Sequence, residues 1–122
     1  MISREKERTK DSVVKLADQV DGLGQAVCCP SCGEINLHHE ITEVFNRRTE
    51  DAKDGLHVLV TGASSTIETG MSANPSPYRD GILIRFSCEH CDANPVMVIT
   101  QHKGTTYMKF ISGDYAPQER SS

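Results

Sequence analysis

The residues of this chain best suited to chemistry are four cysteines arranged in two Cys-x-x-Cys turns. The first turn, Cys29-Pro30-Ser31-Cys32, and the second, Cys88-Glu89-His90-Cys91, are far apart in the sequence and are here named the first and second hooks. Two intervening residues let both sulfurs of a tight turn point at one ion about 2.3 Å away. Four thiolates from two such turns are a common ligand set for tetrahedral zinc. The spacing therefore predicts a structural Zn²⁺ site formed by Cys29, Cys32, Cys88 and Cys91.

Other interpretations of these residues compete with the zinc site. A redox Cys-x-x-Cys normally accompanies a βαβ pattern, which this sequence lacks. Cys28 could replace Cys29 as a ligand, but the two-residue gap is the commoner spacing, so we expect Cys28 to be a small buried hydrophobe. His90 could compete as a ligand, although four cysteines already close the site and leave no open position for catalysis.

Composition narrows the class of protein. A chain of 122 residues fits one domain, and its few aromatic residues give a marginal core that a metal would help to stabilise. The formal charge of −4, made more negative by a Zn(Cys)₄ site, argues against a protein that coats nucleic acid through bulk charge. Five cysteines, an odd number, fit a reducing compartment. With no apolar run long enough for a signal peptide or a membrane span, we expect a cytoplasmic protein.

The N-terminal region is predicted to contain one short helix. Apolar residues recur at helical spacing between positions 13 and 20, and Gly22 stands where a helix C-terminal glycine belongs. The stripe consists of Val13, Leu16, Ala17 and Val20. We expect this helix either to cover the domain's own sheet or to pair with a partner or a second copy of the chain, which would give a homodimer.

The rest of the chain favours antiparallel strands. In residues 35–47 the spacing of Leu37, Ile41, Val44 and Phe45 would also suit a helix, but the β-formers of this run and its place after a zinc hook favour a strand. Residues 56–61 are a β-rich run after a polar turn, whereas residues 62–81 have the composition of a loop. Residues 82–88 alternate in polarity and lead into the second hook. Residues 95–100 and 105–111 flank a Lys103-Gly104 turn and predict a hairpin.

The hairpin turn also predicts a register and a core. A two-residue loop would pair His102 with Thr105, Ile99 with Met108, and Met97 with Phe110. We expect the face that carries these apolar side chains to be core, as for Ile82, Ile84 and Phe86 in the preceding strand. The opposite face, which carries Val96, Val98, Tyr107, Lys109 and Ile111, would need a cover, and the N-terminal helix is the natural candidate.

Three further sequence segments point to a family resemblance. They are Glu43-Val44-Phe45-Asn46-Arg47, Asn74-Pro75-Ser76-Pro77-Tyr78-Arg79-Asp80-Gly81 and Gln101-His102-Lys103-Gly104-Thr105. Together with the hooks, they resemble small zinc-ribbon proteins of actinobacteria and their phages over about residues 28 to 110. The resemblance implies zinc ligands at the four hook cysteines and a bacterial or infected-cell cytoplasm. It carries over no catalytic residue.

The sequence as a whole predicts a mainly β fold: a zinc ribbon with antiparallel β-hairpins and one short N-terminal helix. The predicted divisions are residues 1–24 (helix and linker), 25–111 (zinc-ribbon domain) and 112–122 (flexible tail). We expect a non-enzymatic module that binds a protein partner in transcription or in host and phage regulation.

Two other functions stay open. A nucleic-acid-binding ribbon would use basic and aromatic residues near the last sheet, which are also the candidate partner-binding residues: Arg47, Arg48, Tyr78, Arg79, Arg85, His102, Lys103, Tyr107 and Lys109. A ββα-metal (HNH-type) nuclease is suggested by His38-His39. That reading requires a helix before the second hook, where the sequence favours a strand.

Overall fold

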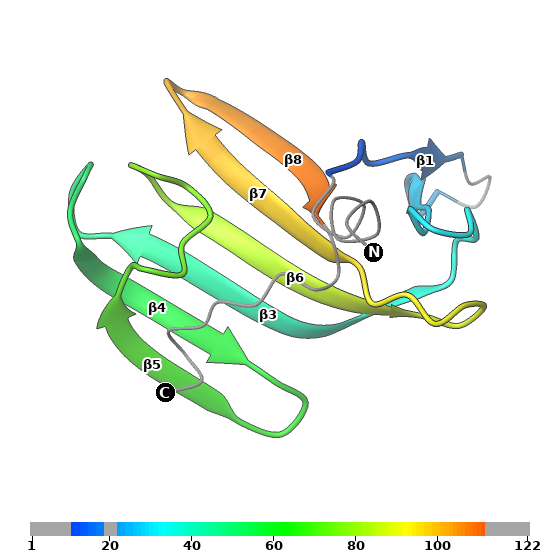
Figure 1. Cartoon of the computed structure of the whole chain (residues 1–122), viewed down its shortest axis with the longest axis horizontal. Coiled ribbons are helices and arrows are strands. Elements are labelled where there is room, and N and C mark those ends of the chain that lie inside the picture. The colour runs from blue at the N-terminus through cyan, green and yellow to red at the C-terminus, as the bar shows by residue number, and fades with distance from the viewer. Residues whose placement is uncertain (1–10, 19–21, 112–122) are drawn as a thin grey trace, which may run out of the picture.

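The computed structural model describes residues 11–18 and 22–111, and these parts of the chain are built from β-strands (Figure 1). None of the described residues forms a helix, so none belongs to a helix able to cross a membrane. The strands are β1 (Leu16–Ala17), β2 (Ala26–Val27), β3 (Leu37–Arg47), β4 (Asp54–Val60), β5 (Ser65–Gly70), β6 (Gly81–Cys88), β7 (Val96–His102) and β8 (Thr105–Ile111). The prediction of a mainly β, antiparallel fold is confirmed.

Six of the strands form one antiparallel sheet in the order β5-β4-β3-β6-β7-β8, and β1 and β2 form a separate small pair. The central strands β3 and β6 run in opposite directions, so the start of β3 lies beside the end of β6, and Leu37 pairs with Cys88. The first hook precedes β3 and the second follows β6. The pairing of the two central strands therefore brings the hooks to the same end of the sheet, at the right of Figure 1.

The β7–β8 hairpin has the predicted register. His102 pairs with Thr105, and the pairs Ile99–Met108 and Met97–Phe110 follow. The turn residues Lys103 and Gly104 both have positive φ, 52° and 82°. This is the conformation that a two-residue type I′ turn requires, and it matches the right-handed twist of the flanking strands.

One face of the sheet, here called the covered face, holds the buried core. Its apolar centre consists of Phe45, Leu83, Val96 and Val98. Met71 and Ala73, from the segment that links β5 to β6, pack onto these side chains, and Ile111 borders them. The segment crosses the sheet at the end opposite the hooks (Figure 1). The cover over this part of the core is thus an irregular segment, residues 71–80.

Arg47 holds this covering segment in place. Its guanidinium donates hydrogen bonds to four carbonyl oxygens, at 2.5 Å on Ala52, 2.6 Å on Ser76, 2.9 Å on Arg79 and 3.0 Å on Pro77. Within the segment, the Ser76 hydroxyl donates to Asp80 O (2.6 Å) and accepts from the Gln101 amide (3.1 Å). Side-chain bonds therefore replace the regular ladder that this stretch lacks.

The opposite face of the sheet, here called the apolar face, differs from the prediction. Met97 and Phe110 are buried, as expected, but Met108 is half exposed, and Ile82, Ile84 and Ile99 are only partly buried. In β6, the fully buried residue is Leu83, on the covered face. The assignment of the core to the apolar face was therefore wrong for most of its area.

Two element predictions are corrected as well. Instead of helix, residues 16–17 form β1, which pairs with β2, and Ser12 bridges to Phe110. The predicted helix is thus wrong over its described part, and its remainder lies outside the described residues. The stretch 62–81, predicted as a loop, includes strand β5, which pairs with β4. The predicted domain boundaries remain predictions, and the 112–122 tail lies outside the described residues.

Candidate metal centre

The four hook cysteines converge at the end of the β3–β6 pair. The sulfurs of Cys29, Cys32, Cys88 and Cys91 all lie within 4.8 Å of one another. Two contacts cross between the hooks, Cys29–Cys91 at 3.8 Å and Cys32–Cys88 at 3.5 Å. Four sulfurs bound tetrahedrally to zinc at about 2.3 Å would stand about 3.8 Å apart. The donor set and its spacing therefore fit a metal ion of this size.

The backbone of each hook supports its sulfurs. The amides of Ser31 and His90 each donate to the sulfur two residues earlier, Cys29 and Cys88, at 3.4 Å. In the first hook, Gly33 has φ +84° and donates its amide to Cys29 O at 2.9 Å. Such N–H···S bonds favour the charged thiolate, because they place positive partial charges beside it.

The thiols of the two hooks shift one another's pKa values. The His90 amide, together with the neighbouring Cys32 and Cys91, lowers the pKa of the Cys88 thiol to about 7. For Cys32, the Glu34 amide lowers the pKa, but desolvation and the bonds to the other three cysteines outweigh it and raise the pKa to about 12. One thiolate forms readily, and the next is opposed by the charge already present. A bound cation would allow all four to ionise together.

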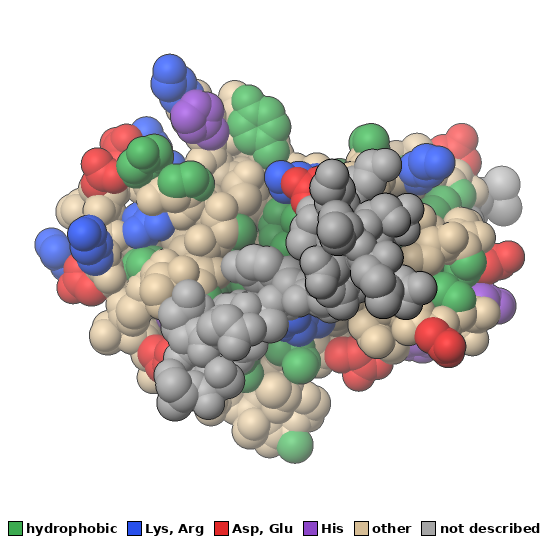
Figure 2. Space-filling model, in the orientation of Figure 1, with side chains coloured by type: hydrophobic (Ala, Val, Ile, Leu, Met, Phe, Trp, Pro, Cys, Tyr) green, Lys and Arg blue, Asp and Glu red, His purple; other side chains and the backbone are tan. Residues whose placement is uncertain are grey.

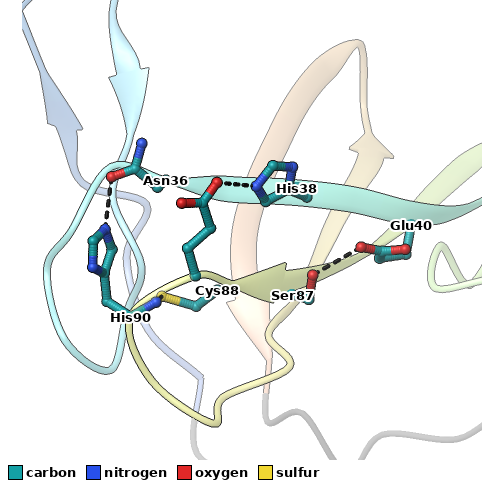
Figure 3. A network of polar contacts seen from close by, with 7 residues as sticks. Asn36, His38, Glu40, Ser87, Cys88 and His90 are labelled. Atoms are coloured by element: carbon teal, nitrogen blue, oxygen red, sulfur yellow. Dashed lines mark hydrogen bonds and ion pairs between the residues drawn. The ribbon is translucent and has the colours of Figure 1, made fainter.

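Polar contacts join the second hook and the end of β6 to the start of β3 (Figure 3). Asn36, just before β3, accepts hydrogen bonds from the His90 ring at 2.7 Å and, through its carbonyl, from the Glu89 amide at 3.1 Å. His38 contacts the Glu89 carboxylate, and Ser87 donates to Glu40 at 2.8 Å. These contacts tie β3 directly to the hook. They also engage the His90 ring in a hydrogen bond with Asn36.

Cys28 lies next to the centre but outside the four-sulfur group. Its side chain is partly buried, and its amide donates to Lys15 O at 2.9 Å, which continues the β1–β2 pairing. Cys28 therefore lies outside the sulfur group, and its side chain is partly rather than fully buried, so its expected role as a small buried hydrophobe stays a prediction.

Most of the basic residues that are predicted to bind a partner already contact acidic side chains of this same chain. Arg48 pairs with Asp54 (3.0 Å), Arg79 with Glu50 (3.3 Å) and Lys109 with Asp11 (2.6 Å), while Arg85 lies 3.7 Å from Glu43. The guanidinium of Arg47 is bonded to carbonyls of the covering segment, as described above. At the left end of the view in Figure 2, blue and red side chains accordingly lie side by side.

The remaining candidates lie near the β7–β8 turn and the covering segment. Tyr78 and Tyr107 are both about half exposed. His102 and Lys103 are at the tip of the hairpin, and both are exposed. A shallow pocket near this end is lined by Arg47, Thr49, Glu50, Arg79, Asp80 and Gln101. Its wall carries both signs of charge, so it is no purely basic groove.

A polar cluster on the covered face was missed by sequence reasoning. Glu43 and His57 are buried, with Glu43 Oε1 2.9 Å from His57 Nε2. Glu68 stands 3.5 Å from the other ring nitrogen of His57, and Phe45 stacks on the ring at 4.1 Å. A glutamate within a β-run looks like a surface residue. Only the pairing of Phe45 with His57 across β3 and β4 brings these groups together.

The comparisons with known proteins give no match: no family model, no curated protein and no solved structure is significantly similar to this chain.

Proposed function

We propose that this chain is a zinc-ribbon module whose Zn(Cys)₄ centre is structural and whose role is to bind a protein partner. The observation that supports it best is the convergence of four cysteine sulfurs from two hooks at the end of the central strand pair. Zinc would be held by Cys29, Cys32, Cys88 and Cys91. Bound there, it would supply cross-linking of the two hooks and charge neutralisation.

A structural role follows from the donor set. Catalytic zinc sites keep one position for water or substrate, whereas four thiolates fill a tetrahedron. The imidazole closest in sequence, His90, is engaged with Asn36. For an HNH-type nuclease, the element leading into the second hook would have to be a helix, and it is strand β6.

A protein partner is favoured over nucleic acid because most of the candidate basic residues are already engaged in contacts within the chain. Arg48, Arg79 and Lys109 form ion pairs with carboxylates, and Arg47 is committed to backbone carbonyls. Binding to phosphate would have to break these contacts. The net charge of −4 adds a long-range repulsion.

We further propose a reducing, cytoplasmic setting, in a bacterial cell or a phage-infected host, with a role in transcription or host and phage regulation. None of the five cysteines forms a disulfide, which fits such a compartment. The assignment to bacteria and phages rests on the family resemblance alone.

The metal is tested by elemental analysis and by substitution. We expect purified protein to contain one equivalent of zinc, and a chelator to remove it together with most of the cooperative unfolding transition, because metal-binding energy in such sites is folding energy. Cys32→Ser should have the same effect. Cys28→Ser is the matched control, since Cys28 is outside the four-sulfur group, and it should retain both zinc and fold. A cooperative fold that survives complete metal removal would contradict the structural role.

The partner class is tested by binding at low salt. We expect little binding of the zinc-loaded protein to random single- or double-stranded oligonucleotides. Tight binding that weakens steeply with added salt would support the nucleic-acid alternative instead, because released counterions produce that dependence. Affinity purification from the native cell followed by mass spectrometry would identify the protein partner.

A further inference from the structure

The apolar face of the sheet carries a continuous row of apolar side chains across all six strands. Register pairing aligns one residue from each strand in a single line, from β5 through to β8. The row is Ile67, Val58, Val44, Ile82, Ile99 and Met108. The adjacent row, nearer the hooks, adds Val60, Ile84, Met97 and Phe110. Neither row contains a charged residue.

Exposure differs sharply between the two faces. On the covered face, Phe45 and Leu83 are completely buried and Val98 nearly so. On the apolar face, no member of the six-residue row is buried, and its two ends, Ile67 and Met108, are 67% and 50% exposed. The middle members Val58, Val44, Ile82 and Ile99 are only partly buried, so the described chain leaves this face incompletely covered.

The edge strand β5 also leaves an apolar side chain exposed on the apolar face. All six of its residues are exposed, and Ile67 is its only large apolar side chain. That side chain points to the apolar face, because it pairs with Val58. Leu56 and Val60 of the neighbouring β4 are also nearly half exposed.

The sequence outside the described ranges contains little that could cover such a surface. Residues 1–10, 19–21 and 112–122 are mostly polar or charged. Their large apolar side chains are only Met1, Ile2, Val20 and Tyr115. Met97 and Phe110 are already buried, and covering the other eight apolar residues of the two rows requires a comparable apolar surface, which these stretches do not supply.

We propose that two copies of this chain pack through their apolar faces, sheet on sheet, to form a homodimer. Charge favours a second copy as the occupant. Each chain is net negative, but the two rows carry no charge, because Glu43, Arg85 and Lys109 lie on the covered face and the Arg48–Asp54 pair lies at the end of the sheet, outside both rows. In a two-fold interface the same patch meets itself, so an uncharged patch brings no like charges together. Faces of this kind pack about 10 Å apart in β-sandwiches.

The size of the face is adequate for this role. Six strands about 4.8 Å apart and about 20 Å of strand length give a plan area on the order of 600 Å². Part of this area is already covered, since Met97 and Phe110 are buried and Ile82, Ile84 and Ile99 are partly buried. The remaining area corresponds to an interface below the roughly 800 Å² per partner of the standard size, which is the range of weaker dimers. This inference does not depend on the identity of any other partner.

Sedimentation and light scattering of the zinc-loaded full chain test the proposal. We expect the wild-type protein to have twice the mass of one chain at about 100 μM, a concentration well above the Kd of most standard interfaces. The double variant Ile67→Lys with Met108→Lys should run as a single chain, with Kd raised at least 100-fold. The matched control, Thr66→Lys with Thr105→Lys, adds the same charges at exposed positions on the covered face and should remain dimeric.

Charge rescue separates dissociation from misfolding. Mixing the lysine variant with Ile67→Glu plus Met108→Glu should restore a dimer that contains one chain of each kind. If the lysine variant loses its β-sheet circular dichroism, the milder Ile67→Ser with Met108→Ser should retain the fold and raise Kd at least 10-fold. A single-chain mass for the wild type at every concentration overturns the proposal. A dimer that survives the apolar-face substitutions, or a control that dissociates equally, overturns it as well.

Discussion

Glu43 is a fully buried carboxylate that lies between two potential cations. One oxygen is 2.9 Å from the His57 ring, and the other is 3.7 Å from the Arg85 guanidinium. A charge removed from water is tolerated only when it is paired, and removing one partner leaves the others without compensation. Glu68, which meets the far side of the same ring, is half exposed and therefore screened by water.

This difference in burial predicts two very different substitutions. Glu43→Ala should lower the free energy of unfolding by about 3–5 kcal/mol, because it removes the carboxylate that faces the buried His57 ring and the partly buried Arg85 guanidinium and leaves a cavity. Glu68→Ala should lower it by less than about 1 kcal/mol. Urea unfolding of the zinc-loaded proteins measures both. If both variants lose the same free energy of unfolding, the buried Glu43–His57 pair contributes no more to stability than the exposed Glu68 contact.

At the scale of elements, local rules predicted the strands well. The segments 37–47, 81–88 and the β7–β8 hairpin follow from β-propensity, alternation and turn chemistry. The hairpin register was also predictable, because a two-residue turn at Lys103-Gly104 fixes which residues pair. The hooks were predictable for a similar reason, since the spacing of the cysteines alone encodes the geometry of a metal turn.

The errors came from interactions that are distant in sequence. The sequence predicts the more apolar face of β6 to be core, yet Leu83 is buried because Met71 and Ala73 pack over the other face. That covering segment is rich in Ser, Asn and Pro and looks like a solvent-exposed loop. The short strands β1 and β2 form through pairing with each other, so helical spacing of Val13 and Leu16 was a misleading signal.

The covering segment depends on close approach of its backbone to β6. A Cβ added at Gly81 would overlap Asn74 Oδ1 and lie 3.0 Å from Pro75 Cδ. Asn74 cannot move aside easily, because its oxygen accepts from the Ser76 amide (2.8 Å) and its amide donates to Arg79 O (2.9 Å). The small size of glycine at this position therefore allows the segment to seal the core.

We expect Gly81→Ala to destabilise the fold by about 2 kcal/mol, in the range of overpacked sites. Gly62→Ala is the control, since an added Cβ there meets nothing within 4 Å. Thermal unfolding should show a clear loss for the first variant and almost none for the second. Proteolysis within residues 71–80 should also become faster for Gly81→Ala. An unchanged melting temperature would mean that the segment can shift at little cost.

At the scale of the whole molecule, the sheet has two distinct ends. One end carries the hooks, where Cys29, Cys32, Cys88 and Cys91 meet, and the other carries the covering segment with Arg47. The two faces also differ. The covered face holds the buried apolar core and the Glu43–His57 pair, whereas the other face is lined by partly exposed apolar side chains. A metal-stabilised end, a sealed face and a proposed dimer face thus occupy separate parts of one small sheet.

The placement of the hooks has a consequence for a broken backbone. The turn at residues 61–64 is exposed or nearly so and lies between the hooks, so a cut there yields two pieces that each carry two sulfur ligands and four strands. We expect separately produced pieces 1–62 and 63–122 to reassemble on adding zinc and to part when a chelator removes it, as followed by native mass spectrometry. Reassembly without zinc would show that pairing of the strands alone is enough to hold the two pieces together. If zinc is required, the ion is a reversible cross-link between the two pieces, and its removal after a single backbone cleavage separates them.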